Sequence, residues 1–231
     1  MSIQVIKPGA FRSHLSSQIA FFDDFVSTNN DSGRLGEMGW YRNAVNGAAS
    51  SGGAVDVSGG TSVHGLKIIY SAGSSADATG WSFNKKTIVS LNAGARLDVR
   101  IARGTNTDTR MWIGIADVIT AVPVVGAATK MVGFRYDTAV DQNIRGFTKN
   151  GAGAETLIDC GAFISTFATY SFDMPDASTV RFFKDGVLLG TSTTNLPSGP
   201  YNCFFGIQTD AAAVKNFVID FFEFNMPLDR T

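Results

Sequence analysis

The stretch that decides the fold is residues 179–197, TVRFFKDGVLLGTSTTNLP. Two runs rich in β-branched and aromatic residues meet at Asp185-Gly186, a dipeptide that accepts the positive φ angles of a two-residue type I′ turn. The pattern predicts a β-hairpin in which Phe182 faces Leu189 and Phe183 faces Leu188. Cross-strand pairs of this kind stabilise a sheet, so this segment is the clearest strand–turn–strand unit in the chain.

Short alternating segments repeat this theme on both sides of the hairpin. Leu97, Val99 and Ile101 alternate with Asp98 and Arg100, which is the period-two pattern of a half-buried strand. No segment carries apolar residues at helical spacing over three turns. About a dozen strands separated by turn residues predict two packed antiparallel sheets. We expect strands over residues 19–26, 38–41, 54–57, 63–70, 87–91, 97–103, 110–115, 132–136, 144–148, 155–159, 169–174, 179–184, 187–191, 203–208 and 214–224.

The organisation of the chain is that of an arm followed by one domain. A length of 231 residues suits a single all-β sandwich, and no linker or fixed-period repeat divides the body. Pro8-Gly9 interrupts any element near the start, so we predict an extended arm over residues 1–17 and a sandwich domain over 18–231. The arm docks on another subunit or adds an edge strand to its own sandwich. Its apolar anchors are Ile3, Val5, Ile6 and Phe11.

Composition excludes several classes of protein. A net charge of −1 argues against a nucleic-acid binder, which needs a basic face. No apolar run approaches the ~18 residues of a membrane span, and residues 1–17 lack the apolar core of a signal peptide. The apolar segment 121–129 is either a loop over a sheet edge or an exposed patch for a partner. We expect a product that stays in the cytoplasm where it is made, or is assembled there.

The cysteines and histidines indicate no metal or cofactor site. Cys160 and Cys203 lie far apart without metal-ligand spacing, and two scattered histidines, His14 and His64, offer no cluster. Free cysteine is among the most buried residue types, so we expect both to be small core residues. The sequence predicts no cofactor and no metal.

The order of features resembles the concanavalin A-like jelly roll, including laminin-G-like modules, and particularly its form in virion proteins of tailed bacteriophages. The resemblance rests on FFDDF at 21–25, Gly39-Trp40, the hairpin above and the motifs LDVRI (97–101), RMWIGIAD (110–117), VGFRYD (132–137) and VIDFFEF (218–224). It implies an all-β, antiparallel two-sheet jelly-roll sandwich whose first and last strands are adjacent in one sheet.

The resemblance also implies a function. It points to a non-enzymatic virion structural protein, foremost a capsid decoration (cement) protein that binds and stabilises the head shell. The partners would be the major capsid protein or other virion subunits, with a homo-oligomer, a trimer before a dimer, and a location in the virion after synthesis in the host cytoplasm. The alternative is a carbohydrate-binding adhesin of a fibre or tail, which would bind a host surface glycan.

Two tryptophans are candidates for stacking on a sugar under that alternative. Trp40 follows Gly39, and Trp112 falls opposite the apolar Met111–Ile115 face, so it would point outward from its sheet. Packing into a core is the default for both. Relatives with this fold also hold Ca²⁺ on rim loops, for which the chain offers oxygens, although we expect these residues to form Asx turns. They are Asn29, Asn30, Asp31, Asp108, Asp141 and Asn143.

No catalytic arrangement emerges from the sequence. Glycoside hydrolysis needs two carboxylates that converge on one face. Asp220 and Glu223 are three residues apart, and Asp23 and Asp24 are adjacent, so alternation places each pair on opposite faces of a strand. No nucleophile elbow and no phosphate-binding loop is present. The sequence therefore predicts a protein that is not an enzyme.

Overall fold

The computed structural model describes residues 18–25, 34–36, 38–45, 53–56, 67–71, 78–83, 89–104, 107–117, 130–140, 142–151 and 154–227. These residues form β-strands without a helix, as the sequence predicts. Accordingly, no helix of the described part is long and apolar enough to span a membrane. The arm anchors Ile3, Val5, Ile6 and Phe11, and the segment 121–129, lie outside the described residues.

Sheet A has the order β15-β14-β13-β8-β17-β5-β4, and β1 pairs with the second half of β17. All of its neighbouring strands are antiparallel. The strands are β1 (Gln18–Asp23), β4 (Gly53–Asp56), β5 (Lys67–Tyr70), β8 (Arg96–Arg103), β13 (Ala168–Asp176), β14 (Thr179–Lys184), β15 (Val187–Ser192) and β17 (Asn216–Pro227).

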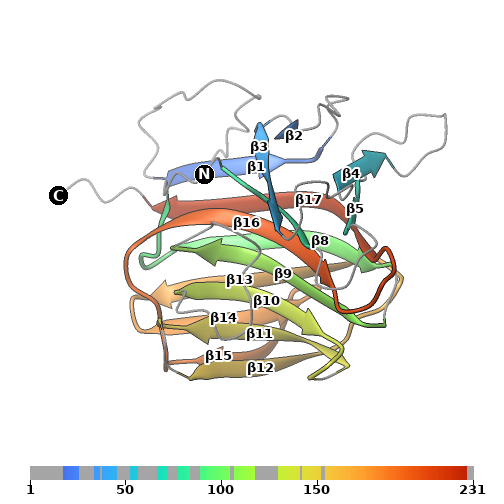
Figure 1. Cartoon of the computed structure of the whole chain (residues 1–231). Helices are drawn as coiled ribbons and strands as arrows, with labels where there is room; N and C mark the ends of the chain where they lie inside the picture. The colour runs from blue at the N-terminus through green and yellow to red at the C-terminus, as the bar shows by residue number, and fades with distance from the viewer. Residues whose placement is uncertain are drawn as a thin grey trace.

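Sheet B has the order β12-β11-β10-β9-β16-β6-β3-β2, and β7 pairs with β16. The two sheets overlap in Figure 1, where β8, β13, β14 and β15 of sheet A interleave down the page with β9, β10, β11 and β12 of sheet B. The strands are β2 (Arg34–Leu35), β3 (Trp40–Val45), β6 (Ala78–Ser82), β7 (Val89–Ser90), β9 (Thr109–Ala116), β10 (Met131–Asp137), β11 (Asn143–Lys149), β12 (Glu155–Ala162) and β16 (Pro200–Thr209).

The first and last strands are neighbours, as the resemblance implies. β1 runs antiparallel to β17, with Phe21 opposite Phe224 and Phe22 opposite Glu223. Phe21 points into the core, whereas Phe22 points outward, because successive side chains alternate between the faces of a strand. The two-sheet jelly-roll sandwich predicted from the sequence is thus confirmed.

The hairpin that decides the fold confirms the predicted turn and corrects part of its register. Asp185 and Gly186 both have positive φ angles, 50° and 80°, as a type I′ turn requires. Phe183 faces Leu188 as expected. Phe182, however, faces Gly190 rather than Leu189, because a β-bulge at Leu189 shifts the register by one residue. A Cβ on Gly190 would lie 2.6 Å from Ile158 Cγ2 of β12, so only glycine fits where the two sheet edges meet.

The core lies between the sheets and is rich in aromatic rings. Leu97, Val99 and Ile101 of β8 are fully buried, as their alternation predicts. Trp40 is also fully buried, with its ring 4.3 Å from that of Phe83 and 4.8 Å from that of Phe205. Trp40 therefore cannot stack on a sugar, and that prediction is wrong. Its position beside a glycine gave no information about burial.

Trp40 is held by a buried carboxylate at the end of β1. Asp23 Oδ2 accepts a hydrogen bond from Trp40 Nε1 at 2.9 Å and from the backbone N–H of Met38 at 3.0 Å. Asp23 Oδ1 accepts one from the backbone N–H of Phe25 at 2.7 Å. Burying a charged group is tolerated when it is hydrogen-bonded in this way. Asp23 thus ties the end of β1 in sheet A to the start of β3 in sheet B.

Both cysteines are free and buried, as expected. Burial raises the pKa of the Cys160 thiol to about 11, and it also raises the pKa of Cys203. A thiol with a raised pKa stays protonated and is a poor nucleophile. Both cysteines therefore act as small apolar core residues.

Candidate functional site

On the outer face of sheet B, the side chains over the central strands are buried rather than exposed to solvent. Trp112 points outward from β9, as its alternation predicts, yet it is only 2% exposed. It belongs to a second buried cluster, separate from the main core. The prediction that Trp112 stacks on a sugar is therefore also wrong. The members of this cluster are Ala78, Trp112, Ala116, Met131, Phe147 and Phe204.

Ion pairs flank this cluster on the outer face of sheet B. Arg135 is paired with Glu155, which also lies 3.8 Å from Lys149 Nζ. Arg110 Nε lies 2.9 Å from Asp210 Oδ2 and 3.5 Å from Asp137 Oδ2. Buried pairs of this kind contribute little net stability, because desolvation offsets their attraction. We interpret them as structural.

On this face, the burial of the Asp137 carboxylate predicts a pH dependence of the stability of the protein. Desolvation by burial raises the pKa of Asp137. The hydrogen bond from the backbone N–H of Ala139 and the charge of Arg110 lower this pKa, but the effect of burial is larger. The contribution of Asp137 to the free energy of unfolding is therefore greatest below the unfolded-state pKa of about 3.9. This contribution is lost as the pH rises through the higher folded-state pKa. Between about pH 4 and pH 7, we expect the free energy of unfolding of the wild type to fall relative to that of Asp137→Asn. Urea unfolding across this range measures it.

Asp159→Asn is the matched control with the opposite sign. The backbone N–H of Gly161, followed by Asn143 and Arg145, lowers the pKa of Asp159. The wild type should therefore gain stability relative to Asp159→Asn as pH rises through the same acidic range. Parallel slopes for the two variants would contradict the assignment of Asp137.

The outer face of sheet A is open to solvent and carries polar and aromatic side chains. We call it the sheet A face. Five neighbouring strands contribute to it in the order β14, β13, β8, β17 and β1. Four strand spacings span ~19 Å, which is long enough for a chain-like ligand. Its members are Arg181, Phe183, Phe167, Thr169, Ser171, Asp173, Arg96, Asp98, Arg100, Asp220, Phe221, Glu223, Asn225 and Phe22.

Three arginines on the sheet A face are each paired with a carboxylate. Arg96 donates to both oxygens of Asp98 at 2.6 Å, and Asp98 also accepts from Ser171 Oγ at 2.5 Å. These bonds place the Asp98 carboxylate firmly between β8 and β13.

The other two pairs join different strands. Arg181 of β14 donates to both oxygens of Asp173 in β13, at 2.8 and 2.7 Å. Arg100 of β8 is paired with Asp220 of β17. Such two-pronged contacts fix the orientation of the planar guanidinium group. The hydrogen bond to Asp98 and that to Asp173 raise the pKa values of Arg96 and Arg181, respectively.

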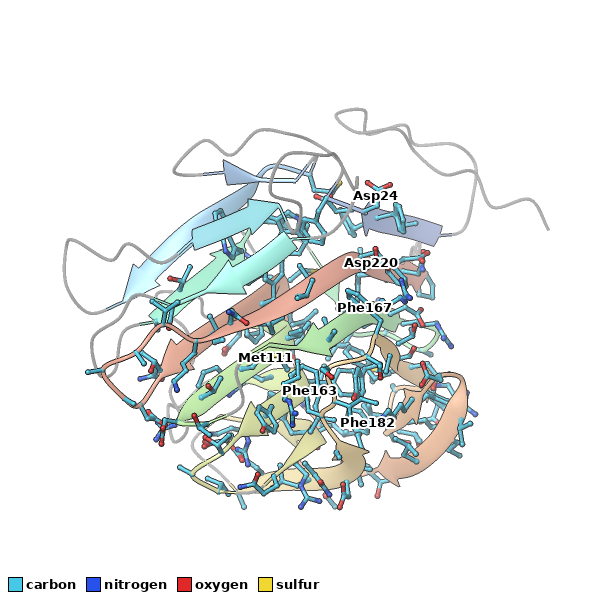
Figure 2. The ribbon with its side chains drawn as sticks, turned by 90° about the vertical axis from the view of Figure 1, so that its right-hand side faces the viewer. Asp24, Met111, Phe163, Phe167, Phe182 and Asp220 are labelled. Atoms are coloured by element: carbon cyan, nitrogen blue, oxygen red, sulfur yellow. The ribbon has the colours of Figure 1, made fainter. Side chains whose placement is uncertain are left out.

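Phenylalanine rings lie among these ion pairs. The guanidinium of Arg100 lies 4.8 Å from the ring centre of Phe167, and that of Arg181 lies 5.6 Å from that of Phe183. At the β1 end, Phe22 lies 6.1 Å from Phe221 and is 37% exposed. In Figure 2, Asp24, Asp220 and Phe167 follow one another down the view, from the end of β1 through β17 to the segment before β13.

A β-bulge in β17 corrects the sequence argument about its carboxylates. The register shifts between Ile219 and Phe221, so Asp220 is the extra residue. Glu223 lies opposite Asp98, and Asp220 pairs with Arg100, so both carboxylates lie on the sheet A face. The prediction that they lie on opposite faces is wrong, because a bulge breaks the alternation. Strict counting by two cannot reveal this.

Glu223 differs from the other carboxylates of the sheet A face. Its Oε1 accepts a hydrogen bond from Asn225 Nδ2 at 2.8 Å, and its cross-strand neighbours are Asp98 and Phe22. No ion pair to Glu223 is formed within the described residues. Glu223 therefore presents an acceptor between an aromatic ring and a fixed carboxylate.

The described residues hold no group of three or more potential metal ligands among His, Cys, Asp and Glu. Of the residues that offer oxygens for Ca²⁺ in the sequence, Asp108 has a carboxylate oxygen 3.9 Å from Lys215 Nζ, and the Asn143 side-chain amide donates to Asp159. Asn29, Asn30, Asp31 and Asp141 lie outside the described residues.

Solved structures of known proteins match this architecture. A β-glucanase of Bacillus licheniformis matches 89% of this chain and 97% of its own, with 12% identity and a TM-score of 0.55. A β-1,3-1,4-glucanase (lichenase) from a mouse hindgut metagenome matches 90% and 99%, with 13% identity and a TM-score of 0.59. The chain has the jelly-roll fold of these glucanases. No protein-family model and no curated protein matches the sequence.

A third structure matches the full length. The match with a protein of unknown function from Shewanella oneidensis MR-1 covers 100% of this chain and 98% of that protein, with 14% identity and a TM-score of 0.59. Identities this low establish the fold alone, since one fold hosts many functions. The virion part of the resemblance therefore stays a prediction.

The comparisons overturn the prediction that the chain is not an enzyme. Glycoside hydrolases are among the proteins that share its fold. The sequence argument also relied on Asp220 and Glu223 lying on opposite faces, and the bulge in β17 brings them to one face. The argument against an enzyme is thus corrected on both grounds.

Proposed function

We propose that the protein binds carbohydrate through the sheet A face. The observation that carries the proposal is the alternation of partly exposed phenylalanine rings with oriented Arg–carboxylate pairs on one continuous sheet surface. A sugar ring presents apolar C–H groups on its faces and hydroxyl groups around its edge. Aromatic rings suit the former, and carboxylate oxygens and guanidinium N–H groups suit the latter.

The fold comparisons support the same class of ligand. A related structure with a TM-score of 0.57 and 10% identity is LamA of Zobellia galactanivorans in complex with laminaritriose and laminaritetraose. Two further matched structures are glucanases by name. We therefore choose β-glucan oligosaccharides as the first ligands to test.

Calorimetric titration with laminari- and mixed-linkage gluco-oligosaccharides tests the proposal. We expect binding by the wild type and a loss of about tenfold or more in affinity for Phe22→Ala, because an exposed platform is removed. The matched control is Leu157→Ala, which removes a side chain of similar exposure (40%) from the outer face of sheet B. An equal loss in both variants, or no binding to any glycan, would refute the proposal. Assaying reducing ends in the same samples reports whether a bound chain is cleaved.

The virion role is a second proposal, supported by the sequence resemblance. In that setting the sheet A face would bind a host surface glycan, and the arm anchors Ile3, Val5, Ile6 and Phe11 would bind the major capsid protein or other virion subunits. Homo-oligomerisation as a trimer and a location in the virion belong to this proposal.

A further inference from the structure

We infer that the ligand of the sheet A face is an uncharged glycan, and that the face discriminates against glycans with carboxylate or sulfate groups. This inference rests on the proposed function and narrows it to a substrate class. The charges of the face carry the argument, because they decide which ligands can approach without breaking existing contacts.

The guanidinium groups of the sheet A face are already committed to carboxylates. Arg96 and Arg181 each use two N–H groups on one carboxylate, and Arg100 is paired with Asp220. An anionic sugar would have to displace an aspartate from such a pair. Displacement would exchange one charge-assisted contact for another and leave the aspartate uncompensated, so it brings no net gain.

Within the described residues, the net charge of the sheet A face is negative. It carries three positive side chains (Arg96, Arg100 and Arg181) and four negative ones (Asp98, Asp173, Asp220 and Glu223). Glu223 lies directly across from Asp98, so the centre of the face repels an anion. At the ~8 Å screening length of physiological salt, groups on adjacent strands still act on a ligand that lies over them.

Neutral hydroxyl groups can bind without breaking these pairs. A guanidinium carries five N–H groups, so a two-pronged contact leaves three of them as donors. Carboxylate oxygens retain lone pairs, and within the described residues Glu223 Oε2 accepts no hydrogen bond, whereas Oε1 accepts one from Asn225. Phe22 and Phe221 at one end and Phe183 at the other offer apolar surfaces for sugar rings.

The test compares neutral and acidic oligosaccharides of equal length. We expect the wild type to bind a neutral β-glucan hexasaccharide at least about tenfold more tightly than an oligogalacturonate or a sulfated hexasaccharide. Affinity for the neutral ligand should stay constant between low and high salt, because no ligand charge is screened. The sharper test is Asp173→Asn, which frees the Arg181 guanidinium from its carboxylate. We expect this variant to gain about tenfold in affinity for the acidic ligand.

Asp159→Asn is the matched control, since it removes the same charge beside Arg145 on the outer face of sheet B. It should leave both affinities unchanged. Tighter binding of the acidic ligand by the wild type would overturn this inference and leave carbohydrate binding intact. An equal gain in Asp173→Asn and Asp159→Asn would overturn it as well, because the effect would then follow total charge. Absence of binding to any glycan would refute the proposed function together with the inference.

Discussion

Replacing Asp23 with alanine is expected to destabilise the protein by about 3–5 kcal/mol. The substitution leaves the N–H groups of Phe25, Met38 and the Trp40 indole without their acceptor, and each unsatisfied buried donor costs about 1–3 kcal/mol. For a chain of this size, 1 kcal/mol corresponds to a shift in melting temperature of about 2–4 °C. We expect thermal unfolding to show a fall of about 10 °C.

Asp24→Ala is the control for this prediction. Asp24 is the next residue and is partly exposed, whereas Asp23 is buried, so removal of the Asp24 side chain should cost under about 1 kcal/mol. A second variant, Asp23→Asn, keeps the shape of the side chain and one acceptor oxygen, but its N–H₂ group faces some of the donors. Its melting temperature should lie between those of Asp23→Ala and Asp24→Ala. Equal melting temperatures for Asp23→Ala and Asp24→Ala would show that the buried carboxylate does not hold the corner between β1 and β3.

The second large effect concerns Phe182, at the centre of the core. Its ring lies 5.7 Å from that of Phe134 and 6.3 Å from that of Phe172, and it is fully buried. We expect Phe182→Ala to cost about 3–5 kcal/mol, since it removes buried apolar surface and leaves a cavity. Urea unfolding followed by tryptophan fluorescence measures this loss.

A neighbouring glycine offers a sharper version of the same test. A Cβ at Gly146 of β11 would lie 2.4 Å from Phe182 Cδ1, so the ring occupies the space that a larger residue would need. Gly146→Ala should therefore cost about 1–3 kcal/mol in the wild type through overpacking. In a Phe182→Leu background it should cost much less. Additive losses in the double variant would show that the two residues do not share this space.

Local sequence patterns predicted the main turn and most of the strands, but they missed β6 (Ala78–Ser82) and the two-residue β2 (Arg34–Leu35). Asp185-Gly186 specifies its turn through the φ angles that the two residues adopt, which depend on nothing distant. The alternation in β8 likewise places Leu97 inward and Arg100 outward without further information. Such features are local, so the sequence alone is enough to predict them.

The bulges could not be predicted in this way. Gly190, beside one register shift, lies against Ile158 of β12, the edge strand of the other sheet. The shift at Asp220 places its carboxylate beside Arg100, a residue 120 positions earlier in the chain. Each bulge thus lies at a contact between distant segments, and a periodic pattern along one strand gives no information about such a contact.

The sheet A face was missed for a related reason. The alternation in residues 96–103 places Arg96, Asp98 and Arg100 on one side of a strand, and this was the available signal. Their neighbours, Asp173, Arg181 and Glu223, come from β13, β14 and β17, whose adjacency depends on the topology. Trp40 and Trp112 are both buried, and phenylalanine instead provides the partly exposed rings of this face.

The pairing of β1 with β17 has a consequence for how the protein is made. Residues 24–215 separate these two strands, so β1 leaves the ribosome long before its partner exists. Pairing between such distant segments is slow, because the chain must lose loop entropy before the contacts form. During this interval Phe21 and Phe22 have no opposing strand. A nascent chain therefore has no complete sheet A face until its last strand has been synthesised.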